Sequence, residues 1–140
     1  MLPQIISGNI HSDDRGSLYY NNDFNASAIK RIYFIENRNT DFVRAWQGHK
    51  IEQRWFSAAN GSFEIKLIAV DNWETPSLNL EQHVFTISSQ KLDVLHIPAG
   101  YISSIRALTD DAKLLVMADY ALGEIKDEYR YDAGYFDVNK

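Results

Sequence analysis

The 140-residue sequence contains no cysteine, only three prolines and no long apolar run. Without cysteine the chain can form neither a disulfide nor a zinc–thiolate site, and a thiolate nucleophile is excluded. The formal net charge of −5 and the isoelectric point of about 5.3 argue against the basic patch that nucleic-acid-binding proteins normally carry. The sequence therefore argues against a nucleic-acid partner.

Signals for membranes and export are lacking as well. No window approaches the roughly 18 apolar residues that a membrane-spanning helix needs. Residues 1–10 carry no basic stretch followed by an apolar run, so we predict neither a signal peptide nor membrane association. The expected location is the cytoplasm.

The overall amino-acid composition is typical of one folded domain. Hydrophobic residues make up 45% of the chain, which at this length is enough to bury a sizeable core. We find no internal repeat, linker or low-complexity tract. The sequence therefore predicts a single domain spanning residues 1–140.

Short β-branched and aromatic segments, separated by turn residues, dominate the sequence. Residues 53–58 and 62–70 flank Asn60-Gly61, and Asn-Gly is a strong hairpin signal. In the second of these segments Phe63 and Ile65 alternate with polar residues, the pattern of a strand with one buried face. Further predicted strands are 17–20, 29–35, 43–47, 83–87, 94–97, 102–107 and 113–118.

Only residues 122–130 have a helical composition, with Glu and Lys among apolar residues, although Gly123 opposes it. About ten short strands at regular spacing are typical of sandwiches and jelly rolls. The predicted fold class is therefore all-β, a jelly-roll barrel or sandwich with a short C-terminal helical segment.

Two stretches resemble the metal-binding motifs of cupin barrels. The first motif normally reads His-x-His followed by Glu and Gly, and its places hold Gln47, His49, Gln53 and Gly61. The second, Pro-x-Gly-x-x-His, ends here in Ser103. A catalytic metal usually needs three or more protein ligands, and one imidazole remains. The resemblance implies a cupin jelly roll without a metal, and it disfavours a metal-dependent oxygenase.

A more specific resemblance covers nearly the whole chain. It is carried by residues 14–18, 29–35, 44–50, 61–63 and 114–120, and by Asp127, Tyr129, Arg130, Tyr131 and Phe136 in the tail. These segments resemble the sugar 3,4-ketoisomerases of the FdtA/QdtA type, also called WxcM-like, among the RmlC-like cupins. The resemblance implies a cupin jelly roll, usually a dimer, whose members act without a metal on thymidine-diphosphate-linked 4-keto-6-deoxy sugars.

Such a reaction moves a carbonyl from sugar C4 to C3 through an enediol, and it needs a base and a proton donor. Imidazole suits the task because its ordinary pKa is near 6.5. Family members carry two histidines one residue apart, where this chain has Gln47 and His49. Residues two apart on a strand share a face, so both are expected to point into the barrel. Glutamine cannot titrate, which leaves His49 as the predicted base and Tyr33 as the predicted proton donor or orienter.

The other predicted site residues would bind the substrate. They are Gln47, Arg44, Arg15, Lys50, Trp46, Trp55, Ser103 and Tyr101. The three cations suit a diphosphate, and glutamine and serine can hydrogen-bond a sugar. The aromatic rings can stack on a base or line the sugar site, although core packing is the alternative for each ring. Salt bridges are the alternative for the cations.

A polar loop at residues 71–82 is longer than the usual four to six residues. We predict that it covers the barrel mouth or reaches a partner subunit.

The sequence thus predicts a metal-independent isomerase or epimerase for a nucleotide-linked, dTDP-type 4-keto-6-deoxy sugar in surface-polysaccharide biosynthesis. It predicts no cofactor and a homodimer. The alternative is a catalytically impaired cupin that binds a nucleotide sugar or supports a partner glycan-synthesis enzyme. Gln47 separates the two hypotheses, because this position is where the chain departs from the two-histidine pattern.

Overall fold

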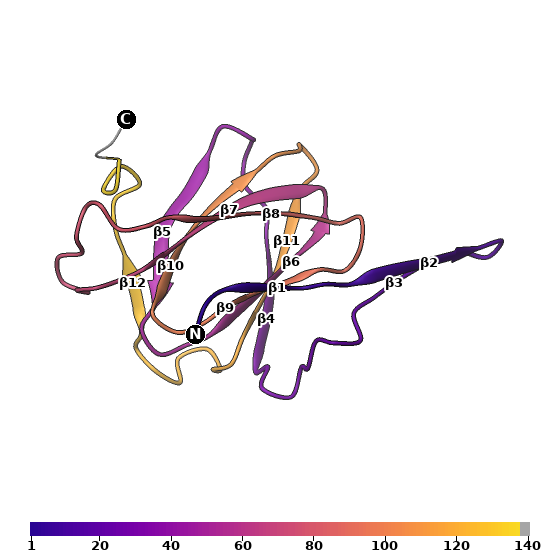
Figure 1. Ribbon diagram of the computed structural model, residues 1–140, viewed down its shortest axis with the longest axis horizontal. Helices are drawn as coiled ribbons and strands as arrows, with labels where there is room; N and C mark the ends of the chain where they lie inside the picture. The colour runs from indigo at the N-terminus through magenta and orange to yellow at the C-terminus, as the bar shows by residue number, and fades with distance from the viewer. Residues whose placement is uncertain (138–140) are drawn as a thin grey trace.

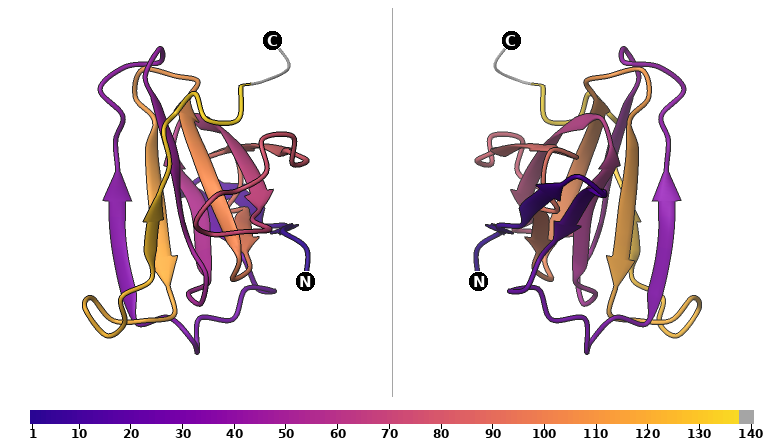
Figure 2. Two further views of the ribbon diagram at one scale, coloured as in Figure 1. Left: turned by 90° about the vertical axis from the view of Figure 1, so that its left-hand side faces the viewer. Right: turned by 90° about the vertical axis from the view of Figure 1, so that its right-hand side faces the viewer.

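Twelve antiparallel strands make up the computed structural model, which describes residues 1–137 (Figure 1). They are β1 (Gln4–Ile6), β2 (Asn9–Asp13), β3 (Gly16–Tyr20), β4 (Arg31–Ile35), β5 (Val43–His49), β6 (Arg54–Asn60), β7 (Ser62–Ala69), β8 (His83–Ser88), β9 (Val94–Ile97), β10 (Tyr101–Ala107), β11 (Lys113–Ala118) and β12 (Glu128–Arg130). One sheet has the order β1-β9-β6-β11-β4 and the other β12-β5-β10-β7-β8, while β2 and β3 form a separate hairpin. The two large sheets face each other as a sandwich (Figure 2), which confirms the predicted all-β class.

Alternating apolar side chains from both sheets fill the space between them. In β7, Phe63, Ile65 and Leu67 are fully buried, and the intervening Glu64 and Lys66 are only half-buried. Their partners from the facing sheet are Phe56, Ala58, Leu95, Ile97, Leu114 and Val116. Burying one large apolar side chain contributes about 1.5–3 kcal/mol, so this cluster is a main source of stability. The period-2 pattern in the sequence therefore identified the core correctly.

The predicted turn at Asn60-Gly61 joins β6 to β7, but the predicted hairpin is wrong, because β6 pairs with β9 and β11 in one sheet and β7 pairs with β8 and β10 in the other. The turn therefore carries the chain from one sheet to the facing one. Gly61 has a φ of +68°, a left-handed conformation that glycine adopts without strain. A Cβ atom there would also lie 2.1 Å from Oγ1 of Thr109. Glycine is thus required at this turn for its backbone conformation and for its small size.

The predicted C-terminal helical segment at residues 122–130 is wrong. Residues 121–125 form turns, with Gly123 at a φ of +77°, and Glu128–Arg130 is strand β12. No part of residues 1–137 is helical. The mixed charged and apolar composition suggested a helix, but pairing of β12 with the edge of β5 determines the conformation here. The short strands β1 and β2 were not predicted either.

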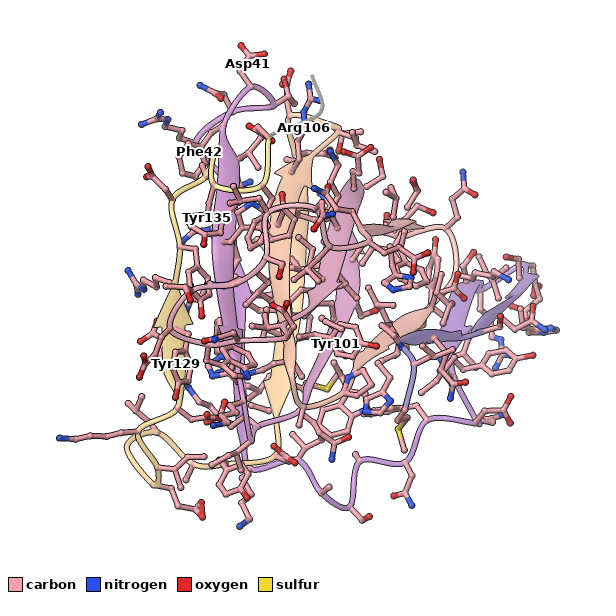
Figure 3. All side chains as sticks on the ribbon, turned by 60° about the vertical axis from the view of Figure 1, so that its left-hand side comes forward. Asp41, Phe42, Tyr101, Arg106, Tyr129 and Tyr135 are labelled. Carbon is pink, nitrogen blue, oxygen red and sulfur yellow. The ribbon has the colours of Figure 1, made fainter. Side chains whose placement is uncertain are left out.

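The long loop between β7 and β8 packs against the end of the chain. The ring of Trp73 lies 4.7 Å from that of Tyr129, and the hydroxyl of Tyr135 donates to the carbonyl of Pro76 at 2.7 Å. Figure 3 shows Tyr129 and Tyr135 along the C-terminal segment beside the second sheet. Residues 71–82 do not line the cavity described below, so the loop does not cover the barrel mouth.

The described residues also lack any helix with the length and apolar character needed to cross a bilayer.

Candidate active site

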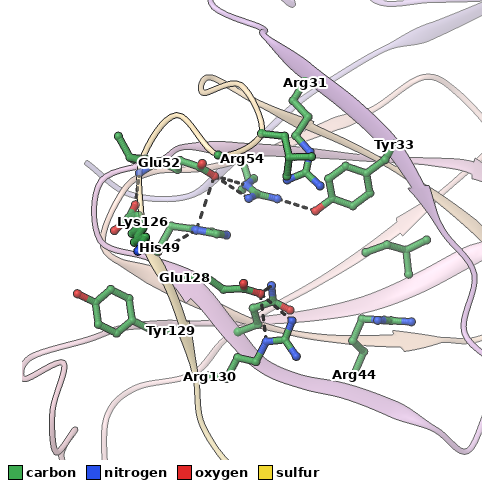
Figure 4. A pocket seen from close by; sticks show the side chains of 16 residues that line it. Arg31, Tyr33, Arg44, His49, Glu52, Arg54, Lys126, Glu128, Tyr129 and Arg130 are labelled. Carbon is green, nitrogen blue, oxygen red and sulfur yellow. Dashed lines mark hydrogen bonds and ion pairs between the residues drawn. The ribbon is translucent and has the colours of Figure 1, made fainter.

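A cavity of about 770 Å³ opens between the two sheets, on the side of the edge strands β4 and β12 (Figure 4). Its wall consists of residues from β4, β5, β6 and β12, of Glu52, and of residues 122, 123 and 125–127 in the segment before β12. A recess of about 40 Å³ continues it inward and adds Phe56, Ile97, Tyr101 and Ile105 to the lining. Volumes of about 300–1,000 Å³ are usual for small-molecule sites.

His49, at the end of β5, points into the cavity with one ring nitrogen engaged. Its Nδ1 lies 3.0 Å from the carbonyl oxygen of Asp127 and 3.6 Å from Oε2 of Glu52. A carbonyl only accepts, so Nδ1 carries the hydrogen, and Nε2 holds the lone pair of the neutral ring. Burial and then the Arg54 guanidinium lower the pKa of His49, against the opposing effects of Glu52 and Asp127. The cavity therefore contains a neutral imidazole whose Nε2 has no hydrogen-bond partner among residues 1–137.

A buried row of polar groups lies beside this imidazole. Arg54 donates to Oε2 of Glu52 from Nε at 3.0 Å and from Nη2 at 2.6 Å. Its Nη1 donates to the hydroxyl oxygen of Tyr33 at 2.6 Å. Arg54 and Glu52 are both buried, so each compensates the charge of the other. Because the Tyr33 oxygen accepts from Arg54, its own hydrogen remains available to a ligand oxygen.

Strand β12 adds a second row of charged and polar groups. Glu128 lies directly opposite His49, and Arg130 lies opposite Gln47. Directly opposed residues of antiparallel strands share a face, and all four side chains line the cavity. Gln47 donates its Nε2 hydrogen to Oε1 of Glu128, which also accepts from Arg130 Nε at 3.1 Å and Nη2 at 2.8 Å. Arg130 holds the pKa of Glu128 below its usual range, so this carboxylate is ionised at neutral pH.

Three further cations line the cavity without a carboxylate partner among residues 1–137, namely Arg31, Arg44 and Lys126. Arg31 lies over the ring of Tyr33 at 4.6 Å, and Arg44 Nε donates to Oδ1 of Asn37 at 3.3 Å. Guanidinium and ammonium groups in this arrangement suit a ligand with several negative oxygens. Within the described part of the chain no three His, Asp or Glu side chains are grouped to hold a metal ion.

Six predicted site residues meet in the cavity and its recess: His49, Tyr33, Gln47, Arg44, Ser103 and Tyr101. Strand alternation places Gln47 and His49 on one face, as predicted. Arg44 shares that face although it is three residues from Gln47, because the pairing of β5 with β10 is irregular between Ser103 and Ile105. The hydroxyl of Ser103 donates to the carbonyl of Gln47 at 3.3 Å.

Two predicted aromatic residues lie outside the cavity. Trp46 is buried on the opposite face of β5, with its ring 5.4 Å from Phe136. Trp55 stacks on His96 at 5.1 Å in a separate cluster on the outer side of β6. Both rings pack against protein, in line with the alternative of core packing.

Two predicted cations are also absent from the cavity lining. Lys50 is exposed in the turn after β5, and its backbone N–H donates to Asp127 at 3.0 Å. Arg15 lies in the turn of the β2–β3 hairpin, which projects from the sandwich in Figure 1, and its Nη2 donates to Asp13 at 2.8 Å. Within one chain neither side chain reaches the cavity.

Several cavity residues were not predicted from the sequence: Arg31, Glu52, Arg54, Lys126, Glu128 and Arg130. Alternation could have identified Arg31, which is two residues before Tyr33 on one strand. It could likewise have identified Arg54, which is two residues before the buried Phe56. Lys126, Glu128 and Arg130 were not predicted, because residues 122–130 were expected to form a helix.

The lowered pKa of His49 predicts how activity and stability depend on pH. Since the folded-state pKa lies below the unfolded value of about 6.5, the unfolded state binds more protons on acidification. The contribution of His49 to the free energy of unfolding is therefore complete above about pH 6.5 and is lost as the pH falls through the folded pKa. A reaction that uses neutral His49 should lose kcat/KM over that same lower range.

Titration of the histidine signals by NMR, with His49 assigned by its absence in a His49→Asn variant, measures this directly. A His49 signal that titrates at or above pH 6.5 would contradict the prediction.

The fold resembles several solved structures of sugar-nucleotide enzymes. A histidine-to-asparagine mutant of the 3,4-ketoisomerase QdtA from Thermoanaerobacterium thermosaccharolyticum is 24% identical, with a TM-score of 0.72 over 98% of this chain and 94% of that one. A 3,4-ketoisomerase from Helicobacter canadensis is 25% identical, with a TM-score of 0.69 over 98% and 96%. The 3'-monoepimerase ChmJ from Streptomyces bikiniensis is 15% identical, with a TM-score of 0.74 over 99% and 73%.

No curated protein sequence matches the chain significantly. The FdtA family, described as WxcM-like, C-terminal, matches residues 2–139. This match includes the cavity residues on β4, β5, β6 and β12. The sequence resemblance is thereby confirmed, and the chain belongs to the FdtA (WxcM-like, C-terminal) family.

Proposed function

We propose that this protein is an isomerase that moves the carbonyl of a dTDP-linked 4-keto-6-deoxy sugar from C4 to C3. The observation that carries the proposal is the neutral imidazole of His49, with Nε2 facing the cavity close to the Tyr33–Arg54 pair. Solved relatives support the substrate class, since QdtA is a 3,4-ketoisomerase seen with TDP-4-keto-6-deoxyglucose and WlaRB is a TDP-quinovose 3,4-ketoisomerase.

In this proposal Nε2 of His49 removes the proton from sugar C3. The bonding electrons form the C3=C4 double bond, and the C4 carbonyl oxygen becomes an oxyanion. The Tyr33 hydroxyl donates a hydrogen bond to that oxyanion while Arg54 holds the tyrosine oxygen from the other side. The His49 imidazolium then returns its proton to C4. The C3 hydroxyl gives up its proton and becomes the new carbonyl, while the oxyanion on C4 gains a proton and becomes a hydroxyl.

The diphosphate would lie among Arg31, Arg44 and Lys126, which face the cavity and lack carboxylate partners among residues 1–137. Proton transfer next to a ketone needs a base and an oxyanion donor, so we propose that the reaction requires no metal or other cofactor. We assign the activity to one domain comprising the whole chain, and its product to surface-polysaccharide biosynthesis.

We also propose that the protein is a homodimer. The projecting β2–β3 hairpin exposes Ile10, Leu18 and Tyr19. An isolated two-stranded hairpin is marginally stable in water, so covering this surface with a second copy would stabilise it.

Proton NMR in heavy water, with a panel of dTDP- and UDP-linked 4-keto-6-deoxy sugars, tests the function. We expect loss of the C3 proton signal and the appearance of the 3-keto isomer with the dTDP compound. Deuterium incorporation with inversion at a carbon and no movement of the ketone would instead identify an epimerase. Ligand-induced broadening with no exchange for any sugar would overturn the enzyme hypothesis and favour the non-catalytic alternative.

A further inference from the structure

We propose that Glu128 is a second catalytic base, which accepts the proton of the sugar hydroxyl that becomes the new ketone. This inference rests on the isomerase function proposed above. Movement of a carbonyl from C4 to C3 transfers two protons, one between carbons and one between oxygens. His49 accounts for the carbon-bound proton, and Gln47 on the same face of β5 cannot titrate. The Tyr33 hydroxyl donates its hydrogen to the oxygen on C4, so the proton of the C3 hydroxyl needs another acceptor.

The position of Glu128 follows from the strand register. It lies directly opposite His49 in the β5–β12 pair, so the two side chains leave the same face of the sheet and enter the same cavity. Figure 4 shows the carboxylate and the imidazole pointing into this space from neighbouring strands. A sugar ring whose C3 lies against the imidazole would therefore place its vicinal oxygens within reach of Glu128.

The hydrogen bonds of Glu128 leave one oxygen available. Oε1 accepts from Gln47 and twice from Arg130, which fixes the carboxylate at three points. Among residues 1–137 no group hydrogen-bonds to Oε2. The side chain is 48% exposed, so a ligand can reach this oxygen through the cavity mouth. Gln47 and Arg130 are thus positioning residues, and Oε2 is the reactive atom.

The proton balance of the step is complete without a co-reactant. After His49 has removed the C3 proton, Oε2 takes the proton from the C3 hydroxyl, and the electron pair of that O–H bond forms the new C3 carbonyl. The C3=C4 electrons move to C4 and bond the proton returned by His49. The oxyanion on C4 receives the proton from Oε2 and becomes a hydroxyl, which regenerates the carboxylate.

If His49 transfers the carbon-bound proton and Glu128 the oxygen-bound proton, a Glu128→Gln variant should have a specific defect. The C3 proton can still leave to His49 and return as deuterium, but the enediolate cannot lose its C3 hydroxyl proton. We therefore expect exchange at C3 to persist within a few-fold of wild type while formation of the 3-keto isomer falls at least about 100-fold, the usual range for a general base. Both rates come from one NMR experiment in heavy water with dTDP-4-keto-6-deoxyglucose.

Glu124→Gln is the matched control, because Glu124 lies in the same segment, pairs with Lys30 and does not line the cavity. It should leave both rates unchanged. A parallel fall of exchange and isomerisation in Glu128→Gln, or no fall in either, would overturn the role of Glu128 alone. Absence of exchange and isomerisation in the wild type would instead overturn the proposed function, and this inference with it. If the glutamine variant is poorly folded, Glu128→Asp should change the ratio in the same direction.

Discussion

Replacement of His49 by asparagine is expected to reduce isomerase turnover by at least about 10³-fold while binding of dTDP changes less than about threefold. General bases contribute roughly 10²–10⁴-fold to rates, and here the same imidazole both removes and returns the carbon-bound proton. The asparagine amide can donate to the Asp127 carbonyl in place of Nδ1, so the local structure should persist. Steady-state kinetics and calorimetric titration with dTDP separate the two effects.

His11→Asn is the control for this variant. His11 lies on the projecting β2 strand with its side chain 64% exposed, and it does not line the cavity. Turnover should be unchanged in that variant. Retention of more than a tenth of wild-type turnover in His49→Asn would show that another group is the base.

The fold could be predicted from the sequence where periodicity and turn chemistry agree. Phe63 and Ile65 alternate with polar residues next to Asn60-Gly61, and the structure has a tight turn there, followed by a strand with those two side chains in the core. The turn was predicted correctly, but the pairing of its flanking strands as a hairpin was not, because they belong to different sheets. Alternation likewise placed Gln47 and His49 on one face of β5. Local rules are sufficient here, because side-chain direction in a strand depends only on position along it.

Residues whose direction depends on a distant strand could not be placed in this way. Arg44 faces the cavity because the β5–β10 register shifts, and the sequence of β5 contains no sign of that shift. Glu128 and Arg130 reach the site because β12 pairs with β5, about 80 residues away along the chain. Both assignments require knowledge of which strands are neighbours.

The two tryptophans illustrate a related difficulty. Trp46 alternates with Gln47 and so had to face away from the cavity if Gln47 faced into it. Its assignment to substrate binding relied on the chemistry of an aromatic ring, which is equally suited to packing against Phe136. Strand direction was the stronger argument of the two.

Removal of the Asp127 carboxylate is expected to be the most destabilising of the changes considered. Asp127 is buried, and it accepts the backbone N–H groups of Lys50 at 3.0 Å and of Ile51 and Glu52 at 2.7 Å each. These bonds attach residue 127, which precedes β12, to the turn that follows β5. Hydrogen bonds to charged groups contribute about 1.5–3 kcal/mol each, and losses at one site are not additive.

We therefore expect Asp127→Ala to reduce the free energy of unfolding by about 3 kcal/mol, since it removes a buried carboxylate and leaves three backbone donors without their acceptor. The midpoint of thermal unfolding should fall by on the order of 10 °C or more. The Asp127 carbonyl also orients His49, so displacement of this segment should reduce kcat even where the variant is folded.

Asp132→Ala, at an exposed position of the same C-terminal segment, is the control and should change the free energy of unfolding by less than about 0.5 kcal/mol. Denaturant titration of both variants measures these changes in the free energy of unfolding. If Asp127→Ala lowers that free energy by less than about 1 kcal/mol, water must replace the carboxylate as the acceptor of the three N–H groups, and the carboxylate does not stabilise the site.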